Sequence, residues 1–159
     1  MSDLYERDFI GWTEQQARAL REAAARGTNL PLDWDHLIEE VEGLSRSELH
    51  AAASQIRRII LHLLKLEFSP SVPPRLGWLE SIADARAELE SLLSSDPGLK
   101  PRLAGVSADE WRRAAKQAVA ALQAHGEDPT GILARQRAGT RYTEDQLLGD
   151  WLPERPDLP

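Results

Sequence analysis

The sequence predicts an all-α protein, a single-domain helical bundle of about five to seven helices. Apolar residues recur three and four positions apart in several segments, and no stretch alternates as a half-buried strand does. A length of 159 residues suits one domain with its own core. Four capping-box patterns predict helix N-termini, because the hydroxyl and the Glu or Gln three residues later each bond a free backbone N–H. They are Thr13/Gln16, Ser45/Glu48, Ser107/Glu110 and Thr143/Gln146.

The N-terminal segment is expected to form a first helical turn followed by a longer helix. Asp3 can cap the turn, and Thr13 restarts or continues the helix to about Arg26. Residues 27–31 are a loop by composition, since glycine, asparagine and proline stand close together there.

Two helices are predicted between residues 33 and 68, with a break between them. Asp33 caps the first of them, whose inward-facing apolar stripe is Leu37, Ile38, Val41 and Leu44. Gly43 and Ser45 indicate a helix stop and a new N-cap in quick succession, so the chain turns back or kinks sharply there. The second helix runs from Ser45 to Phe68 and is the central helix of the bundle. Its apolar stripe is Leu49, Ala52, Ile56, Ile59, Leu63 and Leu66.

The second half of the chain continues the helical pattern more weakly. A proline-rich connector at residues 71–74 leads to an amphipathic helix over residues 78–93, and a further helix runs from Ser107 to Gly126. Beyond Pro129 the pattern predicts only one short helix, from Thr143 to Leu148. We therefore expect a bundle domain over residues 1–150 and a C-terminal tail over residues 151–159.

Composition excludes several function classes. The chain has no cysteine, so disulfides, thiolate metal sites and cysteine nucleophiles are ruled out. A net charge of −7 makes nucleic acid an unfavourable partner, because phosphate binding depends on concentrated Lys and Arg. No apolar stretch is long enough to span a membrane, and the N-terminus lacks the features of a secretion signal. We therefore expect a cytoplasmic location without membrane contact.

Several spaced motifs resemble the bacterial "domain of unknown function 29" family over nearly the whole chain. They are Tyr5-x-x-Asp8-Phe9-x-x-Trp12, Leu37-Ile38-Glu39-Glu40-Val41-Glu42-x-Leu44, Leu61-His62-Leu63-Leu64-Lys65, Leu92-Leu93-x-x-Asp96-Pro97-x-Leu99 and Tyr142-Thr143-x-x-Gln146-Leu147. The chain departs from the family pattern at Leu66, where relatives have an aromatic residue, and at residues 137–141, where they have a proline-containing loop. The resemblance implies a compact helical bundle in a bacterial cytoplasm and implies no activity.

A candidate metal site lies in the acidic segment after Asp33. His36, Glu39 and Glu40 are spaced so that one helix face presents them together, as ligands of a divalent metal. If the chain turns back near Leu44, His50 comes opposite this face, and His36, Glu39, Glu40 and His50 form the candidate set. In one straight helix His36 and His62 would lie about 39 Å apart. The alternative is a solvated acidic face whose glutamates pair with arginine.

Three further positions carry predictions about function. His62 lies in an apolar stretch, which indicates a partly buried imidazole with a hydrogen-bond partner rather than a catalytic base. Trp34 follows a helix cap and Trp151 lies in the tail, so both are candidates for contact with a partner. The alternative for Trp151 is that the tail docks onto its own bundle.

These observations favour a non-catalytic protein–protein interaction module, with an unknown protein partner or a second copy of the chain and no cofactor. A metal-dependent enzyme with carboxylate and histidine ligands on the bundle helices is the alternative. A small nucleic-acid-binding regulator is the third hypothesis, and it requires Arg57-Arg58, Arg112-Arg113 and Arg135-Gln-Arg137 with Arg141 to share one face.

Overall fold

The computed structural model describes residues 2–154 and confirms the all-α prediction. Within this range it has seven α-helices, one 3₁₀-helix and no strand. The elements are α1 (Ser2–Arg7), α2 (Phe9–Ala25), α3 (Trp34–Phe68), α4 (Arg75–Ser95), η1 (Pro97–Arg102), α5 (Leu103–Ala124), α6 (Thr130–Ala138) and α7 (Glu144–Leu148). Among these helices none is long and apolar enough to cross a membrane.

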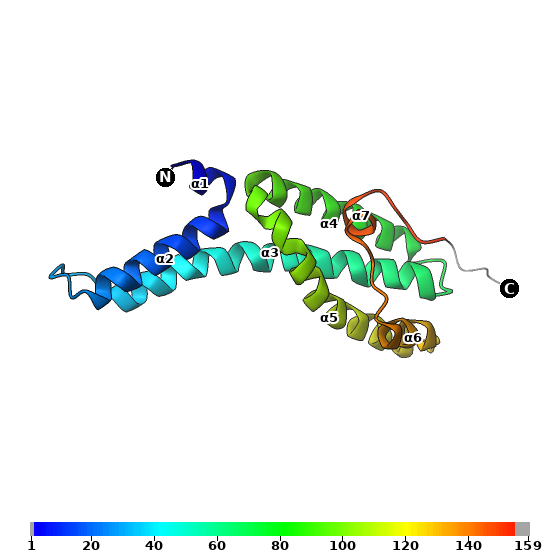
Figure 1. Ribbon diagram of the computed structural model, residues 1–159. Coiled ribbons are helices and arrows are strands. Elements are labelled where there is room, and N and C mark those ends of the chain that lie inside the picture. The colour runs from blue at the N-terminus through cyan, green and yellow to red at the C-terminus, as the bar shows by residue number, and fades with distance from the viewer. Residues whose placement is uncertain (1, 155–159) are drawn as a thin grey trace.

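Helix α3 is the axis of the fold, and the other long helices pack against it (Figure 1). Its 35 residues span about 52 Å at 1.5 Å per residue. Helix α2 packs along its first half, while α4 and α5 pack along its second half. The core therefore lies in the second half, where α3, α4 and α5 bring together Ile56, Ile59, Ile60, Leu63, Leu64, Ile82, Leu89, Trp111, Ala114, Ala115 and Ala118.

The predicted break near Leu44 is wrong, since α3 continues without interruption through Gly43 and Ser45. The Ser45 hydroxyl donates to the carbonyl of Glu42 at 3.0 Å, a bond that serine makes inside a helix. Its side chain is thus satisfied without capping a new helix. A single glycine costs a helix only about 1 kcal/mol, which the packing of α2 on α3 offsets.

Of the four capping boxes, only the one at Thr143 is confirmed. Thr143 accepts from the N–H of Gln146, and the Gln146 side chain accepts from the N–H of Thr143. Thr13 lies inside α2, where its hydroxyl donates to the carbonyl of Ile10, and Ser107 lies inside α5. Carboxylates that the capping boxes did not include accept from free backbone N–H groups at three other starts, namely Asp8 for α2, Asp33 for α3 and Asp96 for η1.

Helix α6 is an element that the apolar pattern missed. Its start is fixed by Asp128, whose Oδ1 accepts from both the N–H and the hydroxyl of Thr130. Its end is fixed by Gly139, which has a φ of 68° and so favours glycine. The predicted tail is non-helical at residues 151–154, and its remainder lies outside the described residues.

Candidate functional site

Helix α2 and the first half of α3 form an antiparallel hairpin that projects from the rest of the bundle (Figure 1). We call residues 18–51 of this hairpin the arm. No residue of the arm is buried, whereas seven residues of α3 beyond it are, from Ala52 to Leu66. The two helices of the arm thus form only a shallow contact, because two helices alone cannot enclose a core.

One side of the arm is charged. Arg21 of α2 forms an ion pair with Glu42 of α3, and Glu14, Arg18, Ser45 and Arg46 line the same shallow groove between the helices. With 100° between successive helical residues, Ala23 lies on the opposite side of α2 from Arg21. The other side of the arm is therefore free of that polar network.

That other side carries an exposed apolar stripe on α3. Leu37 is 37% exposed and Leu44 is 47% exposed, values high for leucine in a helix whose other half forms the core. Positions 37, 44, 51 and 58 recur every seven residues and therefore share one flank of α3. Arg58 is itself exposed and donates from Nε to the Ser81 hydroxyl of α4 at 2.9 Å, so α4 lies beside this flank further along.

The tip of the arm adds two exposed leucines in the loop between α2 and α3. Leu30 is 58% exposed and Leu32 is 46% exposed. The exposed leucines of the arm thus lie in its tip loop and on α3. We call Leu37, Val41 and Leu44 the apolar stripe.

The structure does not bring the four candidate metal ligands together. His36 and His50 lie 14 positions apart on one continuous helix, about 21 Å along its axis. Glu39 and Glu40 are exposed, and Arg46 donates to the backbone carbonyl of Glu39 rather than to a carboxylate. Residues 2–154 contain no group of three or more His, Asp or Glu side chains placed to hold a metal.

His36 instead pairs with the residue that caps its own helix. Its Nδ1 lies 2.6 Å from Oδ2 of Asp33. This hydrogen bond raises the pKa of His36 and lowers the pKa of Asp33. Both side chains are well exposed, so the pair is a local feature of the start of α3.

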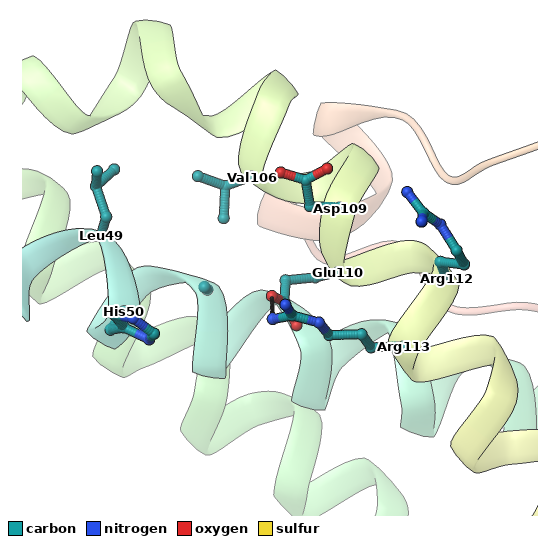
Figure 2. A pocket seen from close by; sticks show the side chains of 8 residues that line it. Leu49, His50, Val106, Asp109, Glu110, Arg112 and Arg113 are labelled. Atoms are coloured by element: carbon teal, nitrogen blue, oxygen red, sulfur yellow. Dashed lines mark hydrogen bonds and ion pairs between the residues drawn. The ribbon is translucent and has the colours of Figure 1, made fainter. Parts of the chain in front are cut away.

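His50 lines a cleft of about 490 Å³ between α3 and α5 (Figure 2). The cleft contains Glu110, a carboxylate that is only 3% exposed. Its Oε1 accepts from Nη1 of Arg113 at 2.8 Å, and its Oε2 lies 3.5 Å from Nη1 of Arg57. Two arginines thus neutralise the buried charge, and the Arg57–Glu110 pair connects α3 to α5.

The remaining predicted sites are placed as follows. His62 is half-buried, and its Nδ1–H donates to the Arg58 carbonyl at 2.8 Å. Burial lowers its pKa, so the imidazole is held neutral with a partner, in agreement with the expected packing role. Trp34 is half-buried at the first position of α3.

Trp151 lies against the bundle in the way that tail docking predicts. Its ring centroid is 5.7 Å from that of Tyr142, and its backbone carbonyl accepts from Nη2 of Arg86 at 2.7 Å. The side chain is still 36% exposed. The docked tail therefore leaves part of the indole open at the surface.

The sequence motifs correspond to contacts between different helices, some adjacent and some distant in sequence. Asp8 accepts from Nη1 of Arg102 at 3.0 Å, and Tyr5, Phe9 and Trp12 form a cluster of three rings. Glu67 of α3 accepts from the hydroxyl of Tyr142 and pairs with Arg135 of α6. Each of these contacts joins two elements of the bundle, which indicates a structural role.

The comparisons with known proteins agree with this fold. A family model described as "Domain of unknown function DUF29" matches residues 4–150. The chain is also similar to a crystal structure of an alpha-helical protein of unknown function from Rhodospirillum rubrum, with 31% sequence identity and a TM-score of 0.67. The similarity covers 92% of this chain and 89% of that one. No curated protein matches the chain.

Proposed function

The chain belongs to the DUF29 family, and on that premise we propose that it acts as a non-catalytic protein–protein interaction module whose contact surface is the apolar side of the arm. The observation that carries the proposal is the exposure of Leu37 and Leu44 on the arm, in which no residue is buried. Contiguous apolar surface of this kind marks interaction sites on soluble proteins.

The energetics of the arm support the proposal. Burying apolar surface contributes about 25 cal/mol per Å², so covering half-exposed leucines stabilises a complex by about 1 kcal/mol each. A third helix packed beside this flank would bury these leucines, in a position like that of α4, which lies beside the same flank further along α3. The arm is thus a two-helix half of a bundle that a partner can complete.

The polar groups of the body support a role without catalysis. Glu110 is neutralised by two arginines, and His62 donates to a backbone carbonyl. His50 lies in the same cleft as Glu110, and no hydrogen bond or ion pair within residues 2–154 orients its imidazole. A general acid–base pair needs a positioned and unneutralised group, which this arrangement does not supply.

Site-specific photo-crosslinking in the native host tests the proposal. A crosslinking side chain at position 44 replaces Leu44 on the apolar stripe, and the same side chain at position 117 replaces Gln117 on the exposed surface of α5, outside the arm. We expect a discrete crosslinked product from position 44 and none from position 117. Crosslinking from position 117 alone, or from neither position, would contradict the proposal.

A further inference from the structure

We infer that the occupant of the apolar stripe is a basic amphipathic helix of a partner protein. The inference rests on the proposed function and adds the chemistry of the partner. Three properties of the arm support it. A flank of α3 has room for one more helix, carboxylates lie on both sides of Leu44 along the helix, and a second copy of the chain would carry the same negative charge as this surface.

The first property is geometric. Helix α3 has 35 residues and α4 has 21, so along about 20 Å of α3 in the arm this flank has no α4 beside it. Leu37, Val41 and Leu44 follow one another at spacings of four and three residues on this length. That is the pattern by which one helix packs its apolar face along another.

The second property is charge. Between residues 33 and 48 the chain carries six carboxylates and a single arginine, Arg46. Glu40 lies four residues before Leu44 and Glu48 four residues after it, so the two carboxylates bracket the stripe along the helix. Neither has an ion-pair partner within residues 2–154, in contrast to Glu42 and Asp33. Lys or Arg side chains beside the apolar face of a partner helix would pair with them.

The third property is what this surface repels. A second copy would bring the same acidic stripe to the interface, and like charges facing each other destabilise a complex. The chain's net charge of −7 adds to that repulsion. A basic helix has the opposite charge and an apolar face of its own, so its cations can pair with the carboxylates while its apolar face covers the leucines.

The test uses the full chain and two synthetic helices as probes. Both are peptides of about three heptads with leucine at the two core positions, one with lysine and the other with glutamate at its flanking positions. Fluorescence anisotropy measures their binding at low and moderate salt. We expect the lysine peptide to bind at least about tenfold more tightly than the glutamate peptide, with an affinity that falls as salt rises.

Matched variants locate the binding surface. Leu44→Asp should weaken binding of the lysine peptide at least about tenfold although it adds a negative charge, whereas Gln117→Asp, which adds the same charge on the exposed surface of α5, should not weaken it. Glu48→Gln should weaken binding about two- to fivefold and reduce its salt dependence. Glu39→Gln removes the same charge away from the stripe and should have less effect. Circular dichroism confirms that each variant keeps its helices.

The outcomes separate this inference from the proposed function. Equal binding of the lysine peptide to the wild type and to Leu44→Asp would overturn the inference, because the attraction would be a general effect of net charge. A crosslink from position 44 to a second copy, with a dimer in sedimentation that Leu44→Asp dissociates, would overturn the inference and leave the interaction function standing. Absence of both peptide binding and crosslinking would overturn both.

Discussion

The carboxylate of Asp96 accepts the backbone N–H of Phe9 at 3.1 Å, although the two residues lie 87 positions apart. The same oxygen accepts the N–H of Gly98 at 3.0 Å. One buried side chain thus satisfies the free N–H groups at the starts of two elements, α2 and η1. Because α2 forms half of the arm, this bond connects the root of the arm to the body of the bundle.

Replacement of Asp96 by alanine is therefore expected to destabilise the protein by about 2 kcal/mol or more, since it leaves two N–H groups without an acceptor. Asp96→Asn keeps an acceptor oxygen and should cost less. Asp33→Ala removes a cap that is exposed and local, with an expected cost of about 1 kcal/mol. Urea unfolding measures all three. An equal loss for Asp96→Ala and Asp33→Ala would contradict the connecting role of Asp96.

Gly98 lies where the chain approaches Asp8 too closely for a side chain. A Cβ at position 98 would come 2.2 Å from Oδ1 and 2.8 Å from the backbone Cα of Asp8. Gly98→Ala should therefore destabilise the protein by about 1–3 kcal/mol. Gly105, in α5, has open space around its Cβ position, so Gly105→Ala should stabilise by about 0.5–1 kcal/mol. Thermal unfolding of the two variants gives shifts of opposite sign if the close approach is real.

Tyr142 connects the C-terminal segment to α3. Its hydroxyl donates to Oε2 of Glu67 at 2.6 Å, and its ring packs edge-on against that of Trp111. Burial, reinforced by the hydrogen bond to the Glu67 carboxylate, raises the pKa of Tyr142, so the hydroxyl keeps its proton.

Tyr142→Phe should cost about 1.5–3 kcal/mol, because it removes a hydrogen bond to a charged group and leaves the carboxylate with Arg135 alone. Tyr5→Phe is the control, since that side chain is 49% exposed and its hydroxyl has no hydrogen bond within the described residues. Denaturant unfolding followed by tryptophan fluorescence compares them. A loss for Tyr142→Phe no greater than that for Tyr5→Phe would show that the bond contributes nothing.

The helices that the sequence predicts well are those whose signals are local. Asp33 caps α3, Phe68 ends it, and Thr143 caps α7, because each of these depends on bonds within a few residues. Ser45 has the same local pattern as Thr143 and lies in mid-helix. What differs is the packing of α2 on α3, which keeps the helix continuous across Gly43 and which no local pattern contains.

The continuity of α3 also decides whether the candidate metal ligands come together. His50 could face His36 only if the chain turned back near Leu44, so the continuity of α3 separates them. The Arg57–Glu110 pair and the Phe9–Asp96 bond join residues far apart in the chain, and one sequence carries no signal for such pairings. The sequence does not predict the exposure of Leu37 and Leu44 for a related reason. Their spacing predicts a core stripe, and only the lengths of α3 and α4 show that nothing in the described chain covers it.

The half-burial of His62 predicts a loss of stability in mild acid. Burial, with smaller contributions from Lys65 and Arg58, lowers its folded-state pKa below the ordinary value of 6.5. Well above pH 6.5 the imidazole is neutral in both states, and its contribution is fully present. As the pH falls, the unfolded chain binds a proton first, so this contribution is lost as the pH falls through the folded-state pKa. The stability advantage of the wild type over His62→Gln should therefore shrink from about pH 7.5 to about pH 5.

The effect of pH on His36 has the opposite sign, because Asp33 raises the pKa of His36. The stability advantage of the wild type over His36→Gln should therefore grow over the same pH range. Chemical unfolding at both pH values gives the two differences, and a His62 difference that does not change with pH would mean that the folded protein does not hold this imidazole neutral.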